Sequence, residues 1–209
     1  MGKKIFIWAS TVIVIIASIY LMGNLVGGGP VASPSEVSAD DWKAGNLEAS
    51  VVLLEYGDFQ CPACASRHPM VKNLLAEFGD HMTYIYRHFP LSIHNFANIS
   101  AAAAEAAGKQ GQFFEMQDLL YTNQTTWVNS VVPEDMFVSY ATDLGLNVSQ
   151  FVQDMNSSDT AALVREDLKS ANKANLPGTP TFFLSGEMIR PGSEGAFRTL
   201  IRNAIEAAS

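Results

Sequence analysis

The sequence predicts an α/β fold in which a β-α-β unit and a β-β-α unit flank a long helical segment. Three observations predict it. Short aliphatic and β-branched runs near both ends of the soluble part are typical of strands. Between them, residues 92–174 carry apolar side chains at helical spacing. An amphipathic pattern at the end of the chain indicates a last helix.

Length and composition limit the possible classes of protein. The chain has 209 residues, which suits one ordinary domain with some additional length. Hydrophobic residues make up 48% and charged residues 16%, so the composition is that of a chain that can bury a core. Acidic residues outnumber basic ones, 21 to 13, and Lys and Arg form no cluster. We therefore expect no nucleic-acid partner.

The N-terminal region has the features of a membrane anchor. Lys3 and Lys4 precede an apolar run from Ile5 to Met22. A helix rises about 1.5 Å per residue, so this run matches the roughly 30 Å of a hydrocarbon core. A cleaved signal peptide is the main alternative, although its apolar part is usually about 7 to 15 residues long. A buried core helix is the other alternative. The sequence predicts a signal anchor, or transmembrane helix, at residues 1–26.

The distribution of positive charges predicts the orientation of this anchor. Lys3 and Lys4 lie before the apolar run, and the next basic residue is Lys43. Basic residues close to a span tend to stay in the cytoplasm. We therefore expect a single-pass protein of the cell membrane with an extracytoplasmic C-terminal domain. Disulfides persist in that compartment.

The boundary of the folded domain is predicted from composition. Residues 27–36 are rich in Gly, Pro and Ser and show no hydrophobic periodicity, which indicates a flexible tether. Folding is expected to begin near residues 40–42. The sequence thus divides into an anchor at 1–26, a linker at 27–46 and a main domain at 47–209.

The first β-α-β unit is predicted from three adjacent patterns. Residues 51–54 form a short aliphatic run that is typical of a buried strand. Apolar positions at helical spacing then continue to Phe78, where Gly79 supplies a stop. Residues 82–89 alternate as in a second strand, which Pro90 ends.

The remaining elements follow in order along the chain. Helices are predicted at 95–107, 112–121, 133–144 and 160–173. Strands are predicted at 181–184 and 188–190, with Ser185 and Gly186 as the turn between them. The final helix is predicted at 194–207.

The two cysteines of the chain carry its most specific chemical signal. Cys61, Pro62, Ala63 and Cys64 have the Cys-x-x-Cys spacing at the predicted start of a helix. Unpaired backbone N–H groups and the helix dipole favour a thiolate there, so Cys61 should be acidic. Pro62 suits a first helical position. A zinc site would need two further ligands, and a structural disulfide of so small a loop would add little stability. Redox chemistry is the favoured interpretation.

Longer motifs around this pair resemble a known family. The segments 55–64, 87–94, 103–108 and 112–116 are similar to those of the DsbA-like thiol-disulfide oxidoreductases in the thioredoxin superfamily. The resemblance covers residues 47–207. It implies a thioredoxin-like fold with an inserted helical domain at about 92–174, preceded here by the predicted transmembrane helix.

The resemblance also implies the remaining site residues. Thr179 and Pro180 match the family's cis-proline loop, which would turn the Thr179 backbone toward Cys61 and bind substrate together with Pro62 and Ala63. A trans-proline turn is the alternative. Glu55 matches a buried acid that exchanges a proton with Cys64, the alternative being an exposed carboxylate at a strand end.

The sequence gives less specific predictions for the roles of four further side chains. Arg67 and His68 fall in the first turns of the predicted helix and could add positive charge near the cysteines, or could lie at the surface. His88 and His94 are expected to serve packing or docking of the helical insert rather than catalysis.

The expected function is that of an extracytoplasmic oxidase. Its redox-active disulfide, Cys61 with Cys64, would be donated to exported cysteine-containing proteins, with no other cofactor and no metal. The resemblance implies a quinone-linked thiol oxidase in the membrane as the partner that reoxidises the pair. A reductase or isomerase of the same fold is one alternative. The other is a non-enzymatic thioredoxin-fold chaperone or a copper-binding module.

Overall fold

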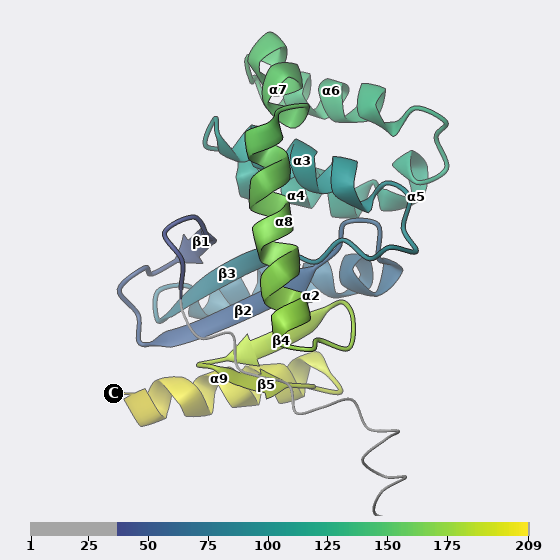
Figure 1. Ribbon diagram of the computed structural model, residues 1–209. Coiled ribbons are helices and arrows are strands. Elements are labelled where there is room, and N and C mark those ends of the chain that lie inside the picture. Colours follow the sequence, from purple (N-terminus) through teal and green to yellow (C-terminus); the bar gives the residue numbers. More distant parts are fainter. Residues whose placement is uncertain (1–36, 209) are drawn as a thin grey trace, which may run out of the picture.

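The computed structural model describes residues 37–208 (Figure 1). The predicted anchor at 1–26 lies outside these residues. None of the helices within 37–208 has both the length and the hydropathy to cross a bilayer.

The centre of the fold is a mixed sheet with the strand order β1-β3-β2-β4-β5. The strands are β1 (Trp42–Gly45), β2 (Val51–Gly57), β3 (Met82–His88), β4 (Thr181–Leu184) and β5 (Glu187–Ile189). Strands β2 and β3 are parallel, whereas the other neighbouring pairs are antiparallel. The parallel pair requires a crossover connection, and helix α2 (Pro62–Phe78) supplies it.

The helices form a cover for the sheet and a separate insert. The insert comprises α3 (Ala97–Gly108), α4 (Phe113–Thr122), α5 (Gln124–Trp127), α6 (Pro133–Asp143), α7 (Val148–Met155) and α8 (Ser158–Lys173). Helix α9 (Glu194–Ala208) ends the described chain. Figure 1 shows α8 running from the insert back to the sheet, where the chain enters β4. The predicted order of β-α-β, helical insert and β-β-α is confirmed.

Three short elements were not predicted from the sequence. Strand β1 and helix α5 contain four residues each, too few to show a periodicity. Helix α7 did have a signal, because the Asn147 side chain accepts a hydrogen bond from the backbone of Gln150 as an N-cap, and Phe151 and Met155 are buried one turn apart.

The predicted linker at 27–46 extends too far toward the C-terminus. Residues 42–45 of that stretch are strand β1, which pairs with β3 in the register of Trp42 opposite Tyr86. Asp41 also belongs to the fold, because its carboxylate forms a buried ion pair with Arg87 at 2.6 Å. The composition did not indicate a strand here, because one short edge strand between polar residues resembles a loop.

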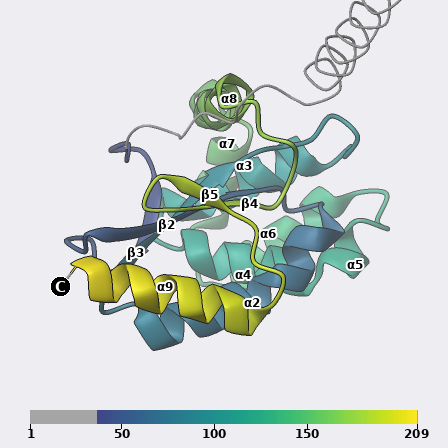
Figure 2. The ribbon, with the colours of Figure 1, turned by 90° about the horizontal axis from the view of Figure 1, so that it is seen from below.

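The two faces of the sheet pack against different helices. Side chains alternate along β2, so Val51 and Leu53 join the core beneath α2 and α9, whereas Leu54 and Tyr56 face the C-terminal part of α8. Figure 2 shows α2 and α9 on one side of the sheet and α8 on the other. Period two places Glu55 on the same face as Leu53, toward α2.

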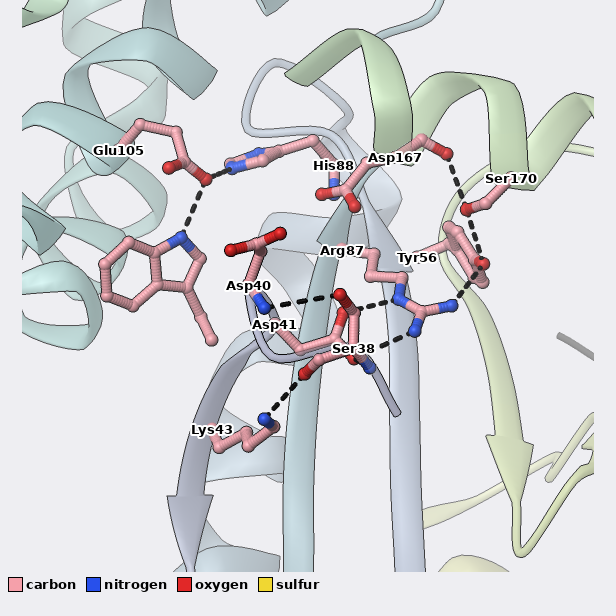
Figure 3. Close-up of polar contacts among 11 residues, drawn as sticks. Ser38, Asp40, Asp41, Lys43, Tyr56, Arg87, His88, Glu105, Asp167 and Ser170 are labelled. Atoms are coloured by element: carbon pink, nitrogen blue, oxygen red, sulfur yellow. Dashed lines mark hydrogen bonds and ion pairs between the residues drawn. The ribbon is translucent and has the colours of Figure 1, made fainter. Parts of the chain in front are cut away.

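Arg87 on β3 joins the sheet to its surroundings through a buried polar cluster (Figure 3). Its Nε and Nη2 donate to Asp41 at 2.6 and 2.8 Å, and its Nη1 donates to the Tyr56 hydroxyl at 3.1 Å. That hydroxyl lies 2.8 Å from Ser170 Oγ on α8. The segment before β1, the sheet and the insert are therefore connected through one guanidinium.

The two histidines expected to dock the insert do make such contacts. His88 Nε2 lies 2.8 Å from Glu105 Oε1 on α3, and both side chains are buried. The same oxygen accepts a hydrogen bond from Trp42 Nε1 at 2.7 Å. His94 Nδ1 lies 2.7 Å from Asp58 Oδ2, which fixes the entry to the insert against the loop after β2.

Candidate active site

Cys61 occupies the N-cap position of α2, directly after the loop that leaves β2. Its backbone N–H donates to Asp58 O at 3.0 Å, and its carbonyl accepts from Ala65 at 3.1 Å. Pro62 takes a first-turn position, where a missing N–H costs nothing because helix starts have unpaired donors. The predicted placement of the cysteine pair at a helix start is confirmed.

The Cys61 sulfur lies against the loop that precedes β4. Its Sγ is 3.4 Å from the backbone oxygen of Thr179, and the Thr179–Pro180 peptide bond is cis, as predicted. Cys61 and Thr179, which are 118 positions apart in the sequence, are therefore in direct contact.

The Cys61 thiol is strongly acidic in this environment. A hydrogen bond from the Cys64 thiol lowers its pKa to about 5 against the opposing effect of burial, and the backbone N–H groups of Ala63 and Cys64 assist. The sequence predicted the acidity and the contribution of the helix start. It did not predict that the second cysteine supplies the largest stabilisation of the thiolate.

Cys64 has the opposite properties. Its side chain is fully buried, whereas Cys61 retains 7% exposure. Burial raises the pKa of Cys64 well above its ordinary value, and its hydrogen bond to Cys61 and the nearby Glu55 carboxylate raise it further. At neutral pH one sulfur is ionised and reachable while the other is a buried thiol.

Glu55 is buried in β2 and is not an exposed strand-end carboxylate. The strand continues to Gly57, two residues beyond the predicted end at Glu55. Burial raises the pKa of Glu55 to about 7, although the Tyr84 hydroxyl donates to its Oε2 at 2.7 Å and favours the ionised form. A carboxyl of this pKa can give or take a proton at neutral pH.

Gln124 is a site residue that the sequence did not reveal. From the first position of α5 its buried Nε2 donates to Phe59 O at 2.7 Å and to Cys61 O at 3.0 Å. The insert thereby fixes the backbone of the loop that carries the reactive sulfur. An isolated glutamine in a helical segment gives no signal of such a role.

The side chains after the cysteine pair differ in their surroundings. His68 is buried, and its Nε2 lies 2.9 Å from Asp118 Oδ1. Burial lowers the pKa of His68, so at neutral pH it adds little positive charge near Cys61. Arg67 instead lies half-buried at the wall of a surface groove, with its Nη1 3.4 Å from Pro191 O.

This groove lies beside the cysteine pair and has a volume of about 540 Å³. Its walls come from the start of α2, the loop before β4, and β5 with the residues that follow. They include Ala63, Arg67, Thr179, Pro180, Ile189 and Arg190. An extended peptide segment could therefore lie next to the reactive sulfur.

The predicted site residues thus fall into two groups. Cys61, Cys64, Glu55 and Thr179 are connected around the sulfur pair by contact or electrostatic interaction. Ala63 and Pro180 line the groove, whereas Pro62 is exposed beside it. Within residues 37–208, no cluster of three or more His, Cys, Asp or Glu side chains is arranged to hold a metal ion.

Fold and site together define a protein of thioredoxin-like architecture with a cysteine pair at the start of α2 and a helical insert. Residues 38–203 match the family described as thioredoxin, and the chain belongs to that family.

Solved structures with the same fold include DsbA-like proteins. BdbD from Bacillus subtilis, in its oxidised form, superposes with a TM-score of 0.75 over 85% of this chain and 100% of its own, at 17% identity. Alpha-DsbA1 from Wolbachia pipientis gives a TM-score of 0.71 over 84% of this chain and 97% of its own, at 21% identity. These similarities show the fold.

Curated relatives are similar in sequence over a part of their length. A protein from Salinispora arenicola named Na(+)/H(+) antiporter NhaA 1 is 40% identical over 147 residues, which is 70% of this chain and 22% of that protein. A protein from Mycolicibacterium gilvum with the same name is 38% identical over 170 residues, or 26% of its length. The chain therefore spans about a quarter of these relatives.

Proposed function

We propose that this protein is an extracytoplasmic thiol-disulfide oxidoreductase that acts as an oxidase. The observation that carries the proposal is the asymmetry of the cysteine pair. Cys61 combines a pKa of about 5 with residual exposure beside a peptide-sized groove, whereas Cys64 is buried with a raised pKa. Such an asymmetry suits a pair in which the exposed sulfur forms the mixed disulfide with substrate and the buried sulfur is the leaving group.

The proposed reaction begins with the pair as a disulfide. A substrate thiolate attacks Cys61 Sγ, the bond between Cys61 and Cys64 breaks, and Cys64 leaves as a thiolate that takes a proton from Glu55. A second substrate thiolate then attacks the substrate sulfur of the mixed disulfide and releases Cys61 as a thiolate. Two electrons pass from the substrate thiols to the cysteine pair, and Glu55 regains its proton from solvent.

Thr179 and Pro180 are proposed to hold the substrate backbone at this step. The contact between Thr179 O and Cys61 Sγ places a backbone hydrogen-bonding group beside the reacting atom. A peptide that pairs with this loop would bring its own cysteine to the sulfur in extended form. Pro62 and Ala63 flank the same position.

The acidity of Cys61 supports oxidation as the direction. A thiolate stabilised in the reduced form is a good leaving group and makes the disulfide form more oxidising. We expect the reduction potential, measured by equilibration with glutathione, to lie near about −120 mV. A potential at or below about −270 mV would indicate a reductase and would contradict the proposed direction.

We further propose a location outside the cytoplasm and two kinds of partner for this protein. The apolar run from Ile5 to Met22 would tether the domain outside the cytoplasm, where exported cysteine-containing proteins are its substrates. The chain contains two cysteines, so the reduced pair needs an external oxidant, for which we propose a quinone-linked thiol oxidase of the membrane. Protease added to intact spheroplasts should digest the domain if this orientation is right.

A trapping experiment tests the proposed activity directly. In the variant Cys64→Ser, the Cys61 thiolate can still attack a disulfide of an exported protein, which is the reverse of the proposed step, and no Cys64 thiol is present to release the resulting mixed disulfide. We expect adducts with exported proteins that disappear on reduction, and Cys61→Ser should form none. A chaperone or copper-binding module would give no covalent adducts in either variant, and that result would contradict the proposal.

The names of the curated relatives refer to ion transport by much longer proteins. The described part of this chain supplies a cysteine pair, a buried acid and a groove, which together support thiol chemistry. Antiport is therefore not proposed for it.

A further inference from the structure

The groove beside Cys61 carries a local charge opposite to that of the whole chain. The sequence has 21 acidic and 13 basic residues, a net charge of −8. Two arginines, Arg67 and Arg190, are among the described residues that line the groove, and no Asp or Glu is among them. The nearest acidic residue on β5 is Glu187, at the opposite end of the strand from Arg190.

The two arginines come from different elements that line the groove. Arg67 extends from α2, and its Nη1 lies 3.4 Å from Pro191 O, so its guanidinium is held at the groove wall rather than directed away from it. Arg190 follows β5 directly and is exposed. No ion pair of the described residues involves Arg67 or Arg190, whereas Arg198 and Arg202 on α9 are occupied by Glu77.

Two other acidic side chains, Glu194 and Asp118, are bonded to other residues and do not neutralise the two arginines. Glu194, the acidic residue that follows the groove in the chain, accepts hydrogen bonds from Arg198 and Asn73. Asp118 is engaged by His68 and Lys72. A guanidinium binds carboxylates in a geometry that few other side chains match.

We propose that Arg67 and Arg190 make this groove selective for substrate segments that carry acidic residues next to the reacting cysteine. This inference rests on the proposed oxidase function and specifies its substrate class. In the reaction, the disulfide of Cys61 with Cys64 is the oxidant and is reduced to the dithiol, while two substrate thiols lose two electrons and two protons. The arginines take no part in bond making and serve to bind and orient the attacking segment.

The test compares matched peptides on the full-length chain, purified in detergent and oxidised beforehand. One peptide carries a single cysteine flanked by two Glu residues, a second has Gln at those positions, and a third has Lys. The initial rate of reduction of the protein disulfide is measured at low salt. Because acidic neighbours raise the pKa of a peptide thiol, each rate is divided by the thiolate concentration from that peptide's own titration.

We expect the acidic peptide to react about threefold to tenfold faster than the neutral one, since an exposed charge pair contributes modestly and two are available. The lysine peptide should be the slowest. Added salt at about 0.5 M should bring the three rates together, because exposed charges are screened at that ionic strength.

Three variants assign the preference to the two arginines. The double variant Arg67→Gln with Arg190→Gln should reduce the acidic-to-neutral ratio to about one. The double variant Arg67→Lys with Arg190→Lys retains both charges and should retain most of the ratio. Arg165→Gln removes an exposed arginine of α8 outside the groove and should leave the ratio as in the wild type.

The outcomes separate the inference from the function on which it rests. A wild-type ratio near one, or a high ratio that survives the double Gln variant, would overturn the selectivity while the oxidase function stands. Failure of all three peptides to reduce the disulfide would instead contradict the proposed function itself.

Discussion

At the scale of single residues, the two sulfurs differ because their surroundings differ. The Cys61 thiolate receives a hydrogen bond from Cys64, which lowers its pKa to about 5. Cys64 has no exposure and lies near the carboxyl of Glu55, both of which raise its pKa. Chemically identical side chains three positions apart thus differ in acidity and exposure.

The pH dependence of Cys61 reactivity follows from this environment. We expect alkylation of the reduced protein to reach half its maximal rate near pH 5 and to be nearly constant above about pH 7. Cys64→Ala removes the largest source of thiolate stabilisation, so its midpoint should move upward toward 9, and Cys64→Ser should move less because a hydroxyl can still donate. A wild-type midpoint above 8 would contradict the assignment of Cys61 as the nucleophilic sulfur.

The same shift predicts how stability depends on pH. A lowered pKa in the folded protein contributes stability that is complete above the unfolded value of about 9 and is lost as the pH falls through the folded value of about 5. We expect the unfolding free energy of the reduced protein, minus that of the oxidised protein, to decrease steadily from pH 9 to pH 5. Urea titrations of both forms measure it. The subtraction removes the part of the Glu55 effect that is common to both forms.

Glu55 is expected to act as the proton donor to the leaving Cys64. In Glu55→Gln, oxidation of a peptide thiol should slow by roughly a hundredfold, the lower part of the range for acid-base catalysis. The wild-type rate, divided by the concentration of substrate thiolate, should fall above about pH 7, where Glu55 loses its proton, and the variant should lack this fall. Glu48→Gln, at an exposed position, is the matched control. Equal pH profiles in variant and wild type would remove Glu55 from the mechanism.

At the scale of elements, the insert supports the active-site loop from a distance in sequence. Helix α5 is a single turn, yet its first residue, Gln124, bonds two carbonyls of the loop that carries Cys61. This contact explains why a helical domain inserted after β3 is relevant to chemistry at the start of α2.

Loss of Gln124 should therefore destabilise the protein. Gln124→Ala removes the buried donor to Phe59 O and Cys61 O, the second of which still accepts from Ala65, and should cost about 1 to 3 kcal/mol in the free energy of unfolding. Gln153→Ala, at an exposed position on α7, should change it by less than about 0.5 kcal/mol. Urea unfolding of both variants provides the measurement, and similar small effects for the two would show that the loop does not depend on this contact.

At the scale of the whole molecule, buried polar contacts hold three parts of the chain in register (Figure 3). Arg87 connects Asp41 before β1 with Tyr56 on β2, and Tyr56 in turn contacts Ser170 on α8. A guanidinium is buried here because its donors are distributed over these partners.

Removing Asp41 alone should lower the free energy of unfolding more than replacing Asp41 and Arg87 together. Asp41→Ala removes the carboxylate of the buried ion pair with Arg87 and should lower the unfolding free energy by about 3 to 5 kcal/mol. The double variant Asp41→Ala with Arg87→Met should recover part of this loss, since neither member of the buried ion pair remains. Asp40→Ala, exposed and adjacent, is the control and should have little effect. A small effect of Asp41→Ala would mean that residues 37–41 contribute little to the fold.

The local signals of the sequence were sufficient for most of the architecture. The strand around Leu53, the helix after Pro62 and the turn at Gly186 were predictable because burial, proline and glycine act over a few residues. Strand β1 was not, because an edge strand of four residues is defined by its pairing with β3 rather than by its own pattern.

The sequence by itself determined that this protein has a cysteine pair at a helix start within an α/β fold, since spacing and periodicity are properties of neighbouring residues. Only the tertiary structure decided the contacts and the burial around that pair. Thr179, Gln124 and Arg190 lie far from Cys61 in the sequence and reach its sulfur, its loop or its groove through the packing of separate elements. Burial and charge at a site depend on such distant neighbours, and these determine its pKa values.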